Sequence, residues 1–258
     1  MTEDFMFTRT GSTTFAPTRN TEGAWSAEDF HFASLAGLIV HETLRVRGDD
    51  SRHISRVSYD ILGRLPYGEV EISVKTIRPG RQIELVQTTV RLGDRDAIVA
   101  RIWFLEPAET EAAAACEIPF LPNPDDCPER VLSEIWEGGH LKQVHARHAL
   151  VPRPGRAATW LTSPNQIVDG EERNAVAEFF SRIDIANGIA ARQEPNEWAY
   201  PNVDLTVHLF RQPKGTWTGL DTTVTWGSEG VGLTSSVLHD VEGPVGRAEQ
   251  SITLRRVN

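Results

Sequence analysis

The sequence predicts an α+β protein built from two tandem repeats, each with one long helix and a strongly curved antiparallel sheet. The first observation behind this prediction is that a helical pattern and four strand-like runs occur in the same order in both halves of the chain. The second is a local match. The arginine, proline and glycine of GRLPYGEV, from Arg64 onward, recur 147 positions later in FRQPKGTW.

The first repeat is assigned to residues 1–106 and opens with a helix predicted over residues 26–47. Ser26 is a suitable N-cap, acidic residues follow in the first turn, and arginines occupy the last turn. Four strand-like runs come next: HISRVSYDILGRL, GEVEISVKTIRPG, RQIELVQTTVRLG and DAIVARIWFL. One helix is therefore followed by four strands.

A linker is predicted over residues 107–130, where prolines are dense and the hydrophobic periodicity is lost. The second repeat, residues 131–258, begins with the strand-like runs LKQVHARHALV and RAATWLTS. Its helix is predicted within GEERNAVAEFFSRIDIANG, with Glu171 and Glu172 at the start and Gly188 as the stop. Four further strand-like runs complete the repeat: NVDLTVHLFRQP, GTWTGLDTTVTWG, GVGLTSSVLHD and VGRAEQSITLRR.

Composition excludes several classes of function. The 258 residues carry a formal net charge of -10, which opposes binding to nucleic acid or to an anionic membrane. The longest apolar run, LAGLIV, is far shorter than the ~18 residues of a membrane span, and the first residues show no leader pattern. A cytoplasmic protein without a membrane span is therefore expected. Cys116 and Cys127 are too few for a disulfide framework, so free thiols are expected.

Comparison of the repeats shows where one copy is more polar than the other. Asp204 lies 147 positions after Val57, and Gln250 lies 148 positions after Ile102. A buried carboxylate or amide without partners is unfavourable, so these side chains either reach solvent or satisfy each other around a shared guest such as water. The alternative is that Asp204 is a gatekeeper on an edge strand and Gln250 a solvated strand residue.

A threonine of the second repeat belongs to the same comparison. Thr225 lies 147 positions after Arg78, and Thr223 lies two residues away on the same strand face. A small slip in the alignment exchanges these two threonines, so both remain candidates.

The strings SYDILGRLPYGEVEISVKTIRPGRQIELVQTTV and NVDLTVHLFRQPKGTWTGLDTTVTWG resemble the acyl-CoA thioesterase II-like family, including its R-P-G-R turn. The resemblance covers most of the chain and implies a double hotdog, in which each of two long helices is wrapped by a curved sheet. It also implies that Asp204, Thr225 and Gln250 hold the hydrolytic water. Asp204 is then expected to act as general base, with the other two side chains fixing the water.

The same resemblance suggests residues that bind the substrate. Asp184 and Asn187, three apart near the end of the second helix, are candidates for the acyl pocket. Helix capping by Asn187 is the alternative. An acyl-CoA ligand also needs cations for its phosphates, and Arg78, Arg81 and Arg211 flank two turns where such contacts are possible. Ordinary solvated turns are the alternative for these arginines.

Metal and cofactor sites are not expected. His145 and His148 lie three apart in an alternating strand, so their side chains point to opposite faces. They therefore cannot bind one metal ion together with His140. The chain also departs from many relatives at the start of the first helix, where Phe32 and Ala33 replace a pair of glycines. A closed or remodelled pocket in the first half is expected there.

The sequence thus predicts an acyl-CoA thioesterase that releases a free acid and coenzyme A. Two alternatives stay open. One is a non-catalytic hotdog protein that binds an acyl ligand or a partner. The other is a tailoring enzyme such as a dehydratase, which needs a histidine near Asp204, and His208 is the close candidate. Because curved sheets leave strand edges to cover, a homodimer or homotetramer is expected.

Overall fold

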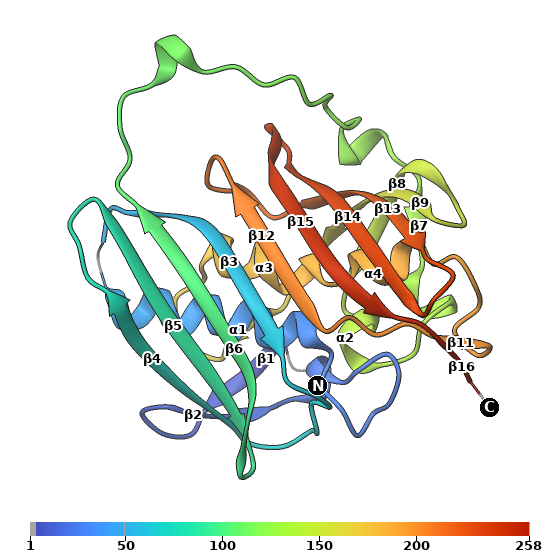
Figure 1. Cartoon of the computed structure of the whole chain (residues 1–258), viewed down its shortest axis with the longest axis horizontal. Coiled ribbons are helices and arrows are strands. Elements are labelled where there is room, and N and C mark those ends of the chain that lie inside the picture. The colour runs from blue at the N-terminus through green and yellow to red at the C-terminus, as the bar shows by residue number, and fades with distance from the viewer. Residues whose placement is uncertain (1–3, 49, 258) are drawn as a thin grey trace.

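The chain forms one continuous curved sheet that encloses two long helices (Figure 1). The computed structural model describes residues 4–48 and 50–257. Among these residues fourteen strands lie in the order β10-β1-β2-β4-β5-β6-β3-β12-β15-β14-β13-β9-β8-β7. All neighbouring pairs are antiparallel except β1 and β10, which are parallel. A short second sheet pairs β11 with β16.

The strands of the first half are β1 (Phe5–Arg9), β2 (Thr14–Pro17), β3 (His53–Ile61), β4 (Val70–Arg78), β5 (Ile83–Leu92) and β6 (Arg95–Leu105). Those of the second half are β7 (Glu129–Arg130), β8 (His145–Arg153), β9 (Arg156–Thr162), β10 (Gln166–Val168), β11 (Trp198–Ala199), β12 (Asp204–Leu209), β13 (Thr218–Trp226), β14 (Val231–Asp240), β15 (Gly243–Thr253) and β16 (Arg255–Arg256). The helices are α1 (Phe32–Arg47), α2 (Gly139–Lys142), α3 (Ala175–Ile183) and α4 (Ala186–Ile189). Short 3-10 turns occupy Arg19–Thr21, Glu111–Ala113, Pro124–Asp126 and Leu132–Glu134.

The two halves meet where β3 pairs with β12 near the middle of the sheet. Val57 lies opposite Val207 in this pair, and both side chains are fully buried. Outward from the junction the order is β6, β5, β4 on one side and β15, β14, β13 on the other. The predicted α+β double hotdog is therefore confirmed, with the two sheets merged into one.

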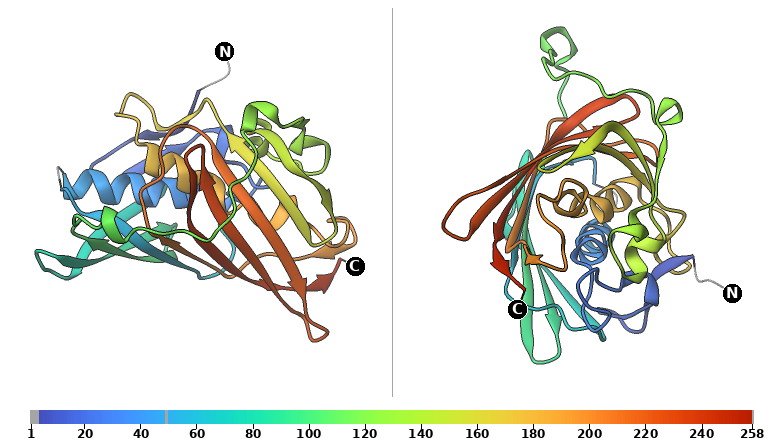
Figure 2. Two further views of the ribbon diagram at one scale, coloured as in Figure 1. Left: turned by 90° about the horizontal axis from the view of Figure 1, so that it is seen from above. Right: turned by 90° about the vertical axis from the view of Figure 1, so that its right-hand side faces the viewer.

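The two long helices pack antiparallel against each other inside the curve of the sheet (Figure 2). Every residue of α1 from Phe32 to Thr43 is buried. The contact is close at Gly37, where an added Cβ would lie 2.6 Å from the Cβ of Ser181 on α3. A glycine is needed there because any side chain would force the helices apart. One hydrophobic core consequently spans both halves.

The first helix begins later than predicted. It starts at Phe32 rather than near Ser26, and His31 is its N-cap, with Nδ1 accepting from the backbone N–H of Ala33 at 3.2 Å. The residues before it fold back as a loop, in which Gly23 donates from its N–H to the carbonyl of Asp29. Ser26 does cap a local turn, but within that loop.

Two boundaries in the second half also differ. The helix α3 begins after Asn174, whose side chain accepts from the N–H groups of Val176 and Ala177, so Glu171 and Glu172 precede the helix. The run predicted as a strand from residue 141 begins instead with α2, and the strand starts at His145.

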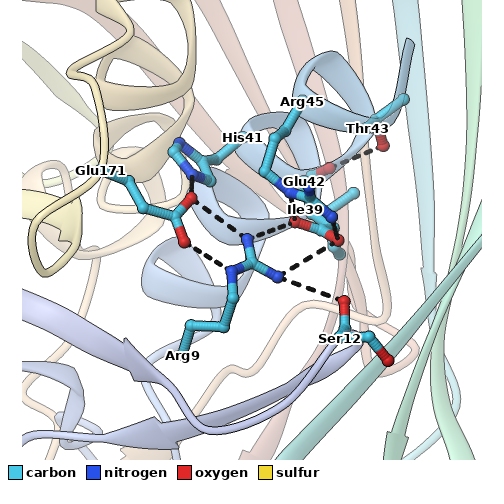
Figure 3. A network of polar contacts seen from close by, with 8 residues as sticks. All are labelled: Arg9, Ser12, Ile39, His41, Glu42, Thr43, Arg45 and Glu171. Carbon is cyan, nitrogen blue, oxygen red and sulfur yellow. Dashed lines mark hydrogen bonds and ion pairs between the residues drawn. The ribbon is translucent and has the colours of Figure 1, made fainter. Parts of the chain in front are cut away.

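A partly buried ionic network ties the N-terminal strand to both halves (Figure 3). Arg9 of β1 donates to Glu42 of α1 at 2.8 Å and to Glu171, just before α3, at 2.5 Å. His41 lies 2.8 Å from the other side of Glu171. Burial alone would raise the pKa of Glu171, but the hydrogen bonds from Arg9 and His41 outweigh it and lower the pKa to about 2. Arg45 also donates to Glu42, whose side chain is 1% exposed.

We expect Arg9→Ala to lower the free energy of unfolding by about 1.5–3 kcal/mol, the range for hydrogen bonds to charged groups, because it leaves Glu42 buried with fewer donors. Urea unfolding at pH 7 measures this loss. Arg91→Ala is the matched control, because its exposed pair with Glu71 contributes below about 1 kcal/mol.

The pH dependence of stability gives a second test of the Arg9→Ala substitution. The folded pKa of Glu171 is lowered from 4.5, so its stabilisation is fully present above about pH 5 and is lost as the pH falls toward 2. The difference in free energy of unfolding between wild type and Arg9→Ala should become smaller as the pH falls from about 5 toward 2. A difference that stays constant from pH 7 to pH 3 would contradict the ionic account.

Candidate functional site

The side chain of Asp184 marks the candidate site, at the end of α3. Its Oδ1 accepts two hydrogen bonds of 2.8 Å, from the amide of Gln250 on β15 and from the amide of Asn202 just before β12. Burial raises the pKa of Asp184 to about 6, and the two amide hydrogen bonds limit the rise. A buried carboxylate is thus held largely ionised at neutral pH by neutral donors.

The other oxygen of this carboxylate faces the start of α1. Oδ2 of Asp184 lies 3.7 Å from Nδ1 of His31, the N-cap residue. Because that nitrogen already accepts from Ala33, it has no proton to donate to the carboxylate. Burial lowers the pKa of His31 well below its ordinary value, so the imidazole is neutral. Within the described chain, Oδ2 therefore has no hydrogen-bond donor and can accept from a ligand or a water.

A second layer of polar groups positions this carboxylate. Asn187 of α4 donates to the carbonyl of Tyr200 at 2.7 Å, and Thr234 of β14 donates to the Asn187 side chain at 3.4 Å. Thr234 lies directly across the ladder from Gln250. The Oε1 of Gln250 is buried and lacks a partner among the residues described, so the amide has an acceptor to spare beside Asp184.

Two cavities meet at Asp184. The smaller has a volume of about 60 Å³ and is walled by aromatic and aliphatic side chains, chiefly Trp25, Trp136, Leu132, Leu141, Ile185, Ile189 and Tyr200. The larger has a volume of about 460 Å³ and runs past Phe30, Ile61, Arg64, Leu65, Val203 and Arg255. Asp184, His31 and Asn202 line both. A substrate that fills both cavities would carry its central atoms past the carboxylate.

The predicted trio of Asp204, Thr225 and Gln250 is not brought together. The carboxylate of Asp204 accepts from the backbone N–H of Ser251 at 2.6 Å, while the next residue, Leu205, is fully buried. Successive strand residues face opposite sides, so Asp204 lies on the outer face and Gln250 on the inner one. Nor is Asp204 on an edge strand, since β12 lies centrally in the sheet.

The two candidate threonines also lie on the outer face of the sheet. Thr225 and Thr223 are exposed, whereas Val224 between them is 1% exposed. Neither threonine faces Gln250. By contrast Asp184 and Asn187, predicted near the acyl pocket, both line the smaller cavity.

The reason lies in the offset between the repeats. An offset of 148 places buried residues on buried residues throughout the paired strands; examples are Val57 with Leu205, Val86 with Thr234, and Ile102 with Gln250. The offset of 147 that selects Asp204 is one residue short, and a slip of one residue moves a strand side chain to the other face. With an offset of 148 in every strand, Thr234 would have been found from the sequence.

The predicted phosphate-binding arginines lie away from Asp184. Arg78 and Arg81 belong to a turn beside the far end of α1, where the last helical residue, Arg47, binds Glu84 at 2.8 Å. The helix places about 24 Å between its two ends. Arg211 holds the buried Asp240 with two hydrogen bonds of 2.6 Å, which occupies its guanidinium in a structural pair.

The histidines do not form a metal site. His140 is buried in α2 and stacks near His31, with ring centroids 4.7 Å apart, while His145 and His148 lie on β8. Across the part of the chain that the structure describes, no group of three or more histidine, cysteine or acidic side chains has the geometry to hold a metal ion. No helix in the same part of the chain is long and apolar enough to cross a membrane.

Comparison with protein families gives two adjoining matches. Residues 21–105 match the acyl-CoA thioesterase N-terminal domain, and residues 117–254 match the acyl-CoA thioesterase C-terminal domain. Among curated proteins no relative matches the sequence.

Solved structures resemble the whole chain. A conserved protein of unknown function with a hot dog fold from Alicyclobacillus acidocaldarius has a TM-score of 0.76 at 12% identity, covering 99% of this chain and 98% of that one. The tesB protein of Mycobacterium avium subs paratuberculosis has a TM-score of 0.70 at 15% identity, covering 96% of both chains. An acyl-CoA thioesterase II from Mycobacterium marinum has a TM-score of 0.70 at 13% identity, covering 98% of this chain and 95% of that one. At these identities the likeness establishes the fold.

The hydrogen bond from Gln250 should set the proton affinity of Asp184. Gln250→Leu removes a donor to the ionised carboxylate, so the pKa of Asp184 should rise above 6 by about one unit, equivalent to ~1.4 kcal/mol. A titration of the labelled aspartate carboxyl carbons by NMR measures it. Asp204→Asn should leave that pKa in place, and an equal shift in both variants would refute the pairing.

Proposed function

This chain belongs to the acyl-CoA thioesterase family, and we propose that it hydrolyses an acyl-CoA to a free acid and coenzyme A with Asp184 as general base. The proposal rests on the hydrogen bonds, the surroundings and the pKa of the Asp184 side chain. One carboxylate oxygen is fixed by two amides, the other has no donor among the residues described, the side chain lines both cavities, and the pKa is about 6. Such a group is ionised at neutral pH and still basic enough to take a proton from water.

The reaction needs little beyond a placed base. Oδ2 of Asp184 would accept a proton from a water that attacks the thioester carbonyl carbon. The resulting tetrahedral intermediate then expels the thiolate of coenzyme A. A thiol with a pKa near ~8.5 leaves readily, so the proton held by Asp184 is sufficient to neutralise it. Neither a serine nucleophile nor a catalytic histidine is required.

The oxyanion would be stabilised by the start of α1. His31, the N-cap, and Phe32, the first residue of the helix, line the larger cavity next to Asp184. The positive end of the helix dipole lies there, which favours negative charge on a carbonyl oxygen during attack. The larger cavity, with Arg255 on its wall beside the Arg64–Asp29 pair, would receive the coenzyme arm.

A dehydratase acting at the same place is the second candidate, favoured by one observation. The dehydratase alternative needs a histidine near an acid, and His31 lies 3.7 Å from Asp184. The histidine expected from the sequence, His208, is exposed on the outer face of β12. Hydrolysis is the better interpretation because Nδ1 of His31 already accepts from Ala33 and is not free to remove a proton from a substrate.

We expect Asp184→Asn to lower kcat by about 10²–10⁴-fold, the usual contribution of a general base. Wild-type kcat/KM should fall about tenfold per pH unit below pH 6, because only the ionised carboxylate is active and protonation removes it. Thiol release from a panel of acyl-CoA esters measures both.

Asp204→Asn and Thr225→Val are the matched controls, and both should retain activity within about threefold since neither side chain reaches Asp184. Loss of turnover in Asp204→Asn with full activity in Asp184→Asn would assign the base to Asp204 instead. No thiol release with any ester, together with acyl species retained in native mass spectrometry, would indicate a binding protein.

His31→Asn separates hydrolysis from dehydration. Asparagine is a strong N-cap, so the variant keeps the start of α1 while removing the imidazole. Hydrolysis should then change by less than about fivefold. Assayed with 3-hydroxyacyl-CoA, the wild type should form no enoyl product. Enoyl formation that His31→Asn abolishes would establish the second candidate.

A further inference from the structure

The smaller cavity is walled by three aromatic side chains, of which Trp136 and Tyr200 are buried while Trp25 is 47% exposed. Trp25, Trp136 and Tyr200 meet edge to face around it, with ring centroids 4.9 Å apart for Trp25 and Trp136 and 5.1 Å for Trp25 and Tyr200. Leu132 and Leu141 also line it, and both are buried. Aromatic pairs of this kind resist displacement because each edge is held by the face of a neighbour.

Its walls are also fixed by hydrogen bonds. Nε1 of Trp136 donates to the carbonyl of Gly188 at 3.2 Å, and the indole is 6% exposed. At Gly188 an added Cβ would lie 3.0 Å from that same nitrogen, so helix and indole are in tight contact. Asn187 holds the backbone carbonyl of Tyr200 at 2.7 Å. A long chain could not enlarge this cavity without breaking several of these contacts.

The volume of the smaller cavity limits how many carbon atoms of an acyl chain it can hold. An apolar cavity of about 150 Å³ holds the six carbons of benzene. In proportion, the cavity of about 60 Å³ beside Asp184 holds two to three carbons. The carbonyl carbon of a substrate lies outside this volume, at the carboxylate itself.

We propose that this protein is selective for short acyl groups, of two to about four carbons, and that Leu132 and Trp136 set the limit. The inference rests on the proposed hydrolysis and names its substrate class. The acyl chain occupies the aromatic-walled cavity, and the coenzyme arm lies in the cavity of about 460 Å³. The cations are consistent with this orientation. Arg255 and Arg64 line the larger cavity, where Arg64 pairs with Asp29 at 2.7 Å, and Asp184 is the only charged side chain that lines the smaller one among the residues described.

The test is a chain-length profile of kcat/KM from acetyl-CoA to palmitoyl-CoA. In the wild type we expect a maximum at or below about four carbons and a fall of at least tenfold over the next two carbons, since one methylene too many in a fixed pocket lowers kcat/KM by about 10-fold or more. Leu132→Ala should move the maximum up by about two carbons. Leu132→Phe, at the same position, should move it down toward acetyl-CoA.

Ile61→Trp is the control, because Ile61 lines only the larger cavity. It should raise KM for all esters alike and leave the maximum in place. A wild-type maximum at eight carbons or more would overturn the inference while leaving hydrolysis established, as would a profile that responds to Ile61→Trp and not to the two substitutions of Leu132. The absence of thiol release from every ester would refute the proposed function itself. Should Leu132→Ala fail to fold, the wild-type and Leu132→Phe profiles still decide.

Discussion

The pairing of β3 with β12 is the contact on which the candidate site depends. It merges the two sheets, and the two long helices then have to pack antiparallel within a shared concave face. Gly37 allows that packing because no side chain separates the helices there. As a result the start of α1 lies against the end of α3, and His31 comes within 3.7 Å of Asp184. Neither half alone would enclose the cavities, since their walls come from both.

The choice of partners distinguishes Asp184 from the other buried acids of the chain. Asp240 and Glu42 are held by arginines, which lower the pKa of each carboxyl below its ordinary value despite burial. Asp184 is held only by amides, and its pKa stays at about 6. A full positive charge would make the carboxylate too weak a base, whereas an amide dipole fixes it in place and preserves its proton affinity. The structural acids and the candidate base are thus separated by the type of donor beside them.

Much of the fold follows from the sequence because hydrophobic periodicity is local and repeats in both halves. The two long helices and the eight long strands follow one another in the predicted order, whereas the short strands β1, β2 and β10 and the short helix α2 were not predicted. The strand face of Asp204 was predicted wrongly. A one-residue error in the offset between the repeats moves a side chain to the other face of the strand without disturbing the hydrophobic pattern. The start of α1 was missed since a histidine is not a usual N-cap. The meeting of His31 with Asp184 joins segments about 150 residues apart, and no local pattern reports it.

The comparison of inner faces explains why one half is specialised. Where the second half carries Thr234 and Gln250, the first half has Val86 and Ile102, both fully buried. A carboxylate among such neighbours would lack donors and would be strongly unfavourable. The first half is therefore unable to hold a second site of the same kind, and it contributes walls instead, through Trp25 and His31. Two like modules thus form one polar centre, because the apolar face of the first can shield from water the carboxylate that the second holds.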